Sequence, residues 1–178
     1  MSAPASPSVE TLTELNLVDL LDSVGLLRLR GTPLHRLFRP AARRFARTAH
    51  EFDTRVGEHG LAQGSAWLMS RMTAGIVTSG LEHVPPQGPV LILANHPGMT
   101  DTVALFTSLA SRPDLRVIAA DRPFLRALPN VARQLIFLPD EEAGRLAALR
   151  APARHLQEGG ALLTFPAGEI EPDPATFG

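Results

Sequence analysis

The sequence predicts an α/β domain with a mainly parallel sheet flanked by helices, preceded by an N-terminal helical region. Over the second half of the 178-residue chain, short apolar runs that suit buried strands alternate with helix-like segments. The first half instead shows apolar residues at helical spacing, interrupted by Gly and Pro. Because 44% of the residues are hydrophobic, the chain has enough apolar side chains to fill a core.

Three helices are expected in the first half, over residues 9–29, 33–56 and 58–72. Gly31 and Pro33 separate the first helix from the second. Pro40 lies inside the second, and we expect it to interrupt or kink that helix. The third helix carries Trp67, which we place in the core, with a membrane-interface position as the alternative.

Strands are expected in the second half at residues 75–80, 90–94, 115–120, 134–138 and 160–165. Helices are expected between them, at residues 100–110, 123–133 and 141–157, the last with an internal Pro152. The run 90–94 (VLILA) is continuously apolar, as in a strand that is buried on both faces. Parallel sheets bind ligands at the carboxyl ends of their strands, so we expect the functional side chains there.

These patterns divide the chain into a disordered segment at 1–8, a helical region at 9–73 and an α/β domain at 74–178. A Pro-rich stretch directly follows the last strand-like run, so we expect the α/β domain to be truncated at its C-terminus. No run approaches the ~20 apolar residues of a membrane-spanning helix, and the first residues do not resemble a signal peptide. We expect a cytoplasmic protein, or one attached peripherally to the cytoplasmic side of a membrane.

The composition argues against one class of partner and two kinds of cysteine chemistry. The formal net charge of −1 argues against nucleic acid as a partner, which requires a basic surface. The absence of cysteine excludes disulfides and thiolate metal sites.

A histidine and an aspartate five residues apart follow the apolar run 90–94. His96 leaves the carboxyl end of this strand, and Asp101 lies about one helical turn further on, where it or Thr100 can cap the next helix. A carboxylate on one imidazole nitrogen fixes the tautomer, so that the other nitrogen can take a proton from a substrate hydroxyl. The pair therefore suits general-base catalysis. The alternative is a loop hydrogen bond at His96 and a simple helix cap at Asp101.

Residues 95–101 match the N-H-x4-D motif in full, and in this they resemble the glycerolipid acyltransferase family, the lysophosphatidic-acid-acyltransferase-like enzymes. Three residues match part of the third motif of that family, F-P-E-G-T-R-S: Phe165, Pro166 and Gly168. The resemblance covers roughly residues 77–177. The F-P-A-G-E form resembles the ornithine-lipid or hemolysin-like branch, in which Glu169 is expected to hydrogen-bond the acceptor; an exposed loop position is the alternative for this side chain.

The resemblance implies transfer of a fatty acyl chain to a hydroxyl of a lysophospholipid or glycerol-phosphate-type acceptor, in phospholipid biosynthesis. The acyl donor is expected to be an acyl-CoA or an acyl-carrier-protein thioester, and the other partners are lipids of the membrane surface. His96 and Asp101 would be catalytic, and Asn95 would help to bind substrate. Neither a metal nor another cofactor is expected.

The sequence departs from the family at positions that normally bind phosphate. Ala167 replaces the Glu of the third motif, and Ile170 stands where its Arg is usual. Pro139 or Asp140 replaces the Arg that ends the second motif. Arginine binds phosphate through paired hydrogen bonds, so substitutes are needed. The expected substitutes follow the strand at 115–120, with solvated surface positions as the alternative: Arg122, Arg126 and Arg133.

Between Asp22 and Glu51 the chain contains seven Arg and no acidic residue. Four of them fall on one helical stripe with apolar neighbours: Arg36, Arg39, Arg43 and Arg47. A basic amphipathic helix can lie on anionic lipid. An ordinary solvated helix face is the alternative.

Two other functions remain open at this point. The degenerate second and third motifs fit a lipid-binding family member without activity. Water in place of the alcohol at His96 would give a thioesterase-like hydrolase. A metal site built from His96, Asp101 and Glu169 lacks an evident fourth ligand and is disfavoured.

Overall fold

The computed structural model of the protein describes residues 8–23, 25–95, 98–139, 144 and 147–168. The N-terminal elements are the helices α1 (Val9–Ser23), α2 (Arg39–His59) and α3 (Leu61–Met72), with short 3-10 helices η1 (Leu27–Leu29) and η2 (Pro33–Leu37) between α1 and α2. After η3 (Leu81–His83) come β1 (Val90–Leu93), α4 (Met99–Ser108), β2 (Arg116–Ala120), α5 (Pro123–Arg126), α6 (Pro129–Ala132), β3 (Leu135–Leu138), α8 (Arg150–Gln157) and β4 (Ala161–Thr164).

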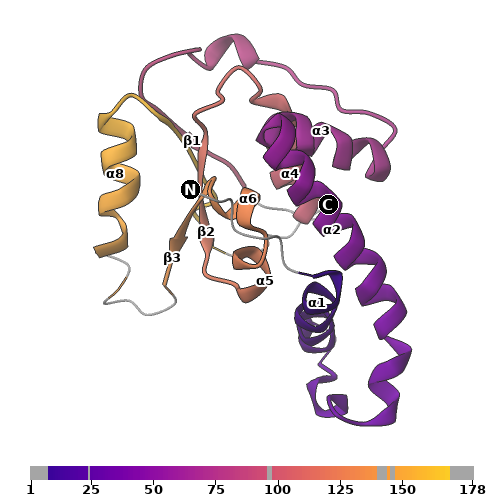
Figure 1. Cartoon of the computed structure of the whole chain (residues 1–178). Helices are drawn as coiled ribbons and strands as arrows, with labels where there is room; N and C mark the ends of the chain where they lie inside the picture. Colours follow the sequence, from indigo (N-terminus) through magenta and orange to yellow (C-terminus); the bar gives the residue numbers. More distant parts are fainter. Residues whose placement is uncertain (1–7, 24, 96–97, 140–143, 145–146, 169–178) are drawn as a thin grey trace, which may run out of the picture.

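The four strands form one parallel sheet in the order β1-β4-β2-β3, which confirms the predicted α/β class. Helices α3 and α4 lie on one side of the sheet, and α8 lies on the other (Figure 1). On the α4 side, Phe106 and Leu109 pack against Val117 and Leu163 of the two central strands. The predicted strands after residue 90 are therefore confirmed, with their ends shifted by one residue or so.

The predicted strand at 75–80 is wrong. This segment has no strand conformation, and within the described residues no other strand pairs with it. Val77 is 99% exposed and Ile76 is half-buried, so no apolar side chain of the segment is fully buried. A strand of this length is not stable without a neighbour that accepts its backbone hydrogen bonds.

The expectation that 90–94 is buried on both faces is also wrong. Strand β1 lies at the edge of the described sheet and pairs only with β4. Its alternate residues Leu91 and Leu93 are 50% and 63% exposed, whereas Ile92 packs against the core beneath α4. A continuous apolar run thus occurs here in a strand that is covered on one side.

Proline positions account for most shifts in helix boundaries. Pro33 starts η2, and α2 begins at Arg39 with Pro40 in its first turn. The predicted helix at 33–56 is therefore interrupted just before Pro40, as expected. Pro40 itself disrupts no hydrogen bond of α2, because it lies in the first turn. Pro129 likewise starts α6 and divides the predicted helix at 123–133 into α5 and α6. Pro152 lies in the first turn of α8, whose predicted beginning at 141 lies outside the described residues.

One hydrophobic core extends from the helical region into the α/β domain. Its centre contains Leu12 of α1 together with Phe52 and Val56 of α2. These side chains pack with Leu128, which directly precedes α6, and with Val131, which belongs to α6. Trp67 packs against this cluster, and the guanidinium groups of Arg55 and Arg71 lie 4.6 and 4.7 Å from its ring centre. The helices at the N-terminus therefore share buried surface with the elements that follow the sheet's second strand.

Candidate active site

Strands β1 and β4 are neighbours, and both end at the same edge of the sheet. Leu93 is in register with Thr164, and the N–H of Ala94 donates to the carbonyl of Thr164 at 3.1 Å. Asn95 therefore leaves one strand next to the point where Phe165 leaves the other. The two motif-bearing segments, 70 residues apart along the chain, start side by side at the carboxyl edge of the sheet.

Asp101 lies in the first turn of α4 and its carboxylate is directed back toward the strand. Its Oδ2 accepts a hydrogen bond from the backbone N–H of Gly98. The acid is half-buried, and Asn95 is exposed. The carboxylate thus faces the backbone of Gly98, directly before α4. His96 itself lies outside the described residues, so its predicted contact with Asp101 stays a prediction.

The third motif forms a tight turn directly after β4. The N–H of Gly168 donates to the carbonyl of Phe165 at 3.0 Å, and Gly168 has a φ of 72°, a conformation that favours glycine. Phe165 packs against the core, while Pro166 and Ala167 are exposed. Pro166 and Ala167 are therefore accessible at the carboxyl edge of the sheet, whereas Phe165 is partly covered. Glu169 and Ile170 lie outside the described residues.

Two of the three predicted arginines follow β2 at the same edge. Arg122 is exposed at the start of α5 and interacts electrostatically with Asp19 of α1. Desolvation raises the pKa of Asp19, and the nearby Asp22 raises it further, whereas the positive charge of Arg122 lowers it. Helix α1 thus places an acidic side chain beside a predicted phosphate-binding arginine.

Arg126 is the second arginine at this edge. Its guanidinium donates two hydrogen bonds to the carboxylate of Asp121, at 2.5 and 2.8 Å, and lies 4.5 Å from the ring centre of Phe137. The hydrogen bonds between Arg126 and Asp121 lower the pKa of Asp121 and raise the pKa of Arg126. The bidentate pair fixes the guanidinium at the end of β2, with 57% of the side chain exposed.

Arg133 does not lie with them. It follows α6 and precedes β3, whose first residue Leu135 is in register with Val117 near the start of β2. Arg133 is therefore at the amino edge of the sheet, where it donates to the side chain of Asn130 at 3.5 Å. The expectation that all three arginines share one edge is wrong for Arg133, because the chain returns through α5 and α6 before β3 begins.

Sequence reasoning missed the two aspartates at this edge. Asp121 directly follows β2, and the position of Arg126 five residues later gave a local signal for their pairing. Asp19 gave no such signal, since its proximity to Arg122 depends on the packing of α1 against α5. Among the described residues, no group of three or more His, Asp and Glu side chains is arranged to hold a metal ion. The described helices also include none that is long and apolar enough to cross a bilayer.

The fold and these turns define an α/β domain with a candidate active site at the carboxyl edge of a parallel sheet. The family model described as "Acyltransferase" matches residues 75–176, which is more than half of the chain. The chain belongs to the acyltransferase family. No curated protein and no solved structure matches it.

Proposed function

We propose that this acyltransferase moves a fatty acyl chain from an acyl-CoA or acyl-carrier-protein thioester to a hydroxyl of a lysophospholipid or glycerol-phosphate-type acceptor. The acceptor belongs to phospholipid biosynthesis, and the enzyme works as a peripheral protein on the cytoplasmic side of a membrane. The observation that carries the proposal is the adjacency of β1 and β4, since it brings the N-H-x4-D and F-P-A-G segments to one edge.

In the proposed reaction, the imidazole of His96 takes the proton of the acceptor hydroxyl while the oxygen attacks the thioester carbonyl carbon. Asp101 orients the ring and stabilises its charged form. The C–S bond of the resulting tetrahedral species breaks, and the thiolate leaves with the proton from the imidazolium. One ester and one thiol are formed from one alcohol and one thioester. The acceptor oxygen is the nucleophile, so the enzyme needs no nucleophile of its own.

The phosphate of the acceptor is proposed to bind at the carboxyl end of β2, on the side of β4 away from β1. Arg122 and Arg126 both lie at the end of β2, one strand away from β4. Guanidinium groups bind phosphate through two parallel hydrogen bonds, which favours a phosphorylated acceptor. On the other side, Asn95 and the Phe165–Gly168 turn lie at the ends of β1 and β4, and His96 and Glu169 follow them along the chain.

The test is an assay of thiol release from palmitoyl-CoA, with and without lysophosphatidic acid as the acceptor probe. The chain contains no cysteine, so a thiol reagent reports only the released CoA. We expect release that depends on the acceptor and is lost in His96→Ala. The matched control is His83→Ala, because this histidine is 84% exposed and lies in η3, outside the motif.

Other outcomes separate the remaining candidates. Release at the same rate without an acceptor would identify a thioesterase-like hydrolase. Binding of the lysolipid without any release would identify a lipid-binding member that has lost activity. Full activity in His96→Ala would exclude this residue as the base.

A further inference from the structure

The turn between α1 and α2 exposes three leucines. Leu27 in η1 and Leu34 and Leu37 in η2 are 40%, 53% and 75% exposed. They lie close together, since η1 packs against η2. Beneath them, Leu26 and Phe38 close a small core with residues of α1 and α2. The leucines are therefore presented at the surface by a folded support.

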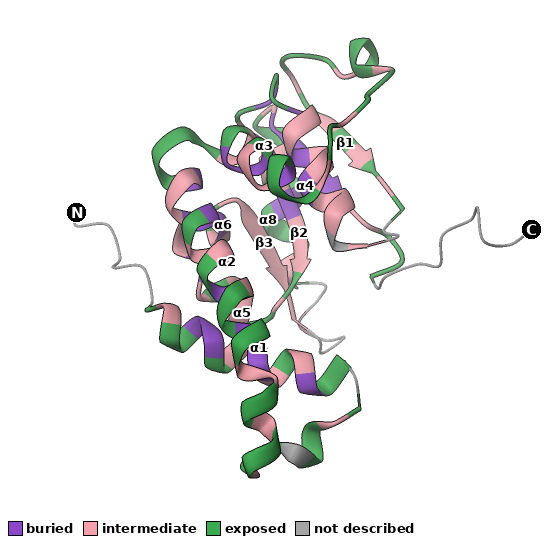
Figure 2. Ribbon diagram, turned by 90° about the vertical axis from the view of Figure 1, so that its right-hand side faces the viewer, coloured by how far each residue is buried: buried purple, intermediate pink, exposed green. Residues whose placement is uncertain are grey.

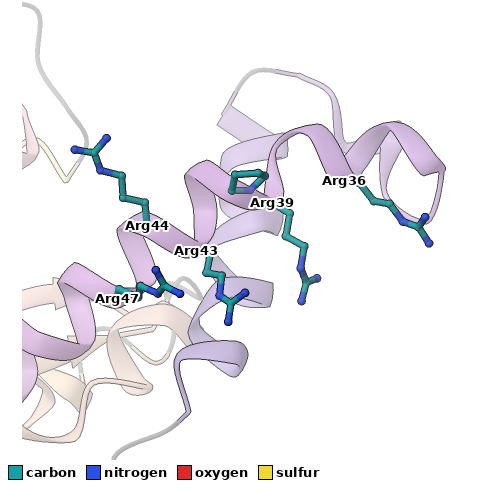
Figure 3. Close-up of a pocket in the computed structure, with 6 residues that line it drawn as sticks. Arg36, Arg39, Arg43, Arg44 and Arg47 are labelled. Atoms are coloured by element: carbon teal, nitrogen blue, oxygen red, sulfur yellow. The ribbon is translucent and has the colours of Figure 1, made fainter.

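Arginines surround this leucine tip, which we define as Leu27, Leu34 and Leu37. Arg28 in η1 and Arg30 directly after it are exposed, and Arg36, Arg43 and Arg47 are exposed along η2 and α2. Figure 3 shows the guanidinium groups of Arg36, Arg39 and Arg43 on the same side of the helix, whereas Arg44 points away. Arg39 alone in this group is paired in the described structure, with Glu10 and Glu14 of α1. A net positive surface thus adjoins exposed apolar side chains.

The leucine tip projects from the side of the molecule that carries the candidate site. In Figures 1 and 2, β2 and β3 point toward the lower side, and the α1–α2 turn extends beyond that side. Helix α1 also packs against α5, which directly follows the carboxyl end of β2. A flat surface that touches the tip would therefore face the carboxyl edge of the sheet.

We propose that the leucine tip and its arginines are the docking surface for an anionic phospholipid bilayer, oriented so that the carboxyl edge of the sheet faces the lipid. Arginines bind the phosphate headgroups, and the leucines enter the boundary between headgroups and acyl chains. A nucleic acid backbone would be bound mainly through charge and would leave the leucines without a role. The docking itself is independent of the proposed function, but its purpose rests on a lipid acceptor.

The test measures sedimentation of the full chain with vesicles of phosphatidylcholine alone or of an equimolar mixture with phosphatidylglycerol, in the absence of acyl donor. We expect binding to the mixed vesicles and little to the neutral ones. Arg43→Gln/Arg47→Gln should lower the partition coefficient about 30-fold. Leu34→Ser/Leu37→Ser should lower the partition coefficient by about tenfold or more, because the leucines no longer enter the lipid.

Matched controls lie elsewhere on the surface. Leu81→Ser changes a leucine that is 41% exposed in η3, which lies at the opposite end of the molecule in Figure 1. Arg150→Gln/Arg154→Gln removes two charges from α8. Both controls should bind the mixed vesicles as the unchanged protein does. Circular dichroism of each variant confirms that the helices are retained.

The inference is overturned if Leu34→Ser/Leu37→Ser binds like the unchanged protein, or if the controls lose as much binding as the tip variants. Its failure differs from failure of the proposed function. Without docking, thiol release should still occur with an acceptor dispersed in detergent micelles. Without acyltransferase chemistry, vesicle binding should persist in the absence of any thiol release.

Discussion

Asp53 of α2 and Asn130 of α6, 77 residues apart, are joined by two hydrogen bonds in the core between the helical region and the α/β domain. The carboxylate accepts from the backbone N–H of Asn130 at 2.9 Å and from its side-chain amide at 3.0 Å. It also accepts from the N–H of Val131 at 2.9 Å. Asp53 is 1% exposed. Through its carboxylate, α2 of the N-terminal region caps the first turn of α6, the helix that leads into β3.

Replacing this carboxylate should destabilise the whole chain. Asp53→Ala leaves two backbone N–H groups of α6 without an acceptor in a buried place, and we expect a loss of about 3 kcal/mol of unfolding free energy. Urea unfolding followed by circular dichroism measures it. Glu58→Ala on the same helix is the control, because that side chain is 60% exposed and should change stability little. An equal effect of the two changes would contradict the role of Asp53.

Gly64 of α3 lies close against Val56 of α2. A Cβ at this position would lie 2.6 Å from Cγ2 of Val56 and 3.0 Å from its backbone nitrogen. We expect Gly64→Ala to cost about 2 kcal/mol despite the gain of up to ~1 kcal/mol in helix propensity, since the helices must move apart. Thermal unfolding compares it with Gly75→Ala, where nothing lies within 4 Å of the added atom. Stabilisation by Gly64→Ala would show that α3 shifts freely.

Asp114 should make stability depend on pH in the acidic range. The hydrogen bond from Arg112 holds the pKa of this carboxyl at about 2, below its usual value, and the N–H of Ala161 adds to the effect. A carboxyl whose pKa is lowered on folding stabilises the fold above its unfolded pKa, and that contribution disappears as pH falls from about 4 to about 2. Because the side chain is 40% exposed, solvent screening limits the effect to about 1 kcal/mol at neutral pH.

The pH prediction is checked by urea unfolding of the unchanged protein and of Asp114→Asn over that range. Their difference in unfolding free energy should be largest at neutral pH and should shrink toward pH 2. A difference that stays constant with pH would mean that Asp114 acts through its hydrogen-bonding shape and not through its charge. Arg112 is 2% exposed and also donates to the carbonyls of Pro85 and Gly159, so these contacts stay in place in the variant.

Asp101→Asn should separate the two roles that this residue can have. The amide oxygen of Asn can still accept from the N–H of Gly98, so the start of α4 and the unfolding temperature should be retained. Asn cannot stabilise a charged imidazole, and we expect kcat to fall by up to about 10⁴-fold, the loss known for a protease triad. Acceptor-dependent thiol release gives the rate. Full activity would leave Asp101 as a helix cap alone.

The arginines at the carboxyl and amino edges of the sheet provide three matched variants. Arg122→Gln and Arg126→Gln should each raise the KM for lysophosphatidic acid about tenfold or more while kcat changes little, because a charged hydrogen bond to the phosphate is lost. Arg133→Gln at the amino edge should leave both constants unchanged. Equal effects of all three variants would point to a general effect of charge and would contradict a phosphate site at the end of β2.

The sequence predicted the central elements of the fold because their signals are local. The strands that became β2, β3 and β4 appear as short apolar runs, and the alternation with helices defined a parallel sheet. The same signals misassigned 75–80 and the exposed face of β1, because an apolar run does not say whether a neighbour is present to cover it. The signal at Pro40 was reliable, because a proline is tolerated in the first turn of a helix but not in its interior, and α2 begins one residue before it.

The sequence by itself determined the family, through two motifs placed after apolar strands, and it predicted which residues would form the site. Only the tertiary structure decided that β4 lies beside β1, that Arg133 is at the far edge, and that α1 brings Asp19 to Arg122. The physical reason is the range of the interactions. Helix and strand patterns arise between residues a few positions apart, whereas strand order and side-chain neighbours depend on how segments distant in the chain bury their surfaces together.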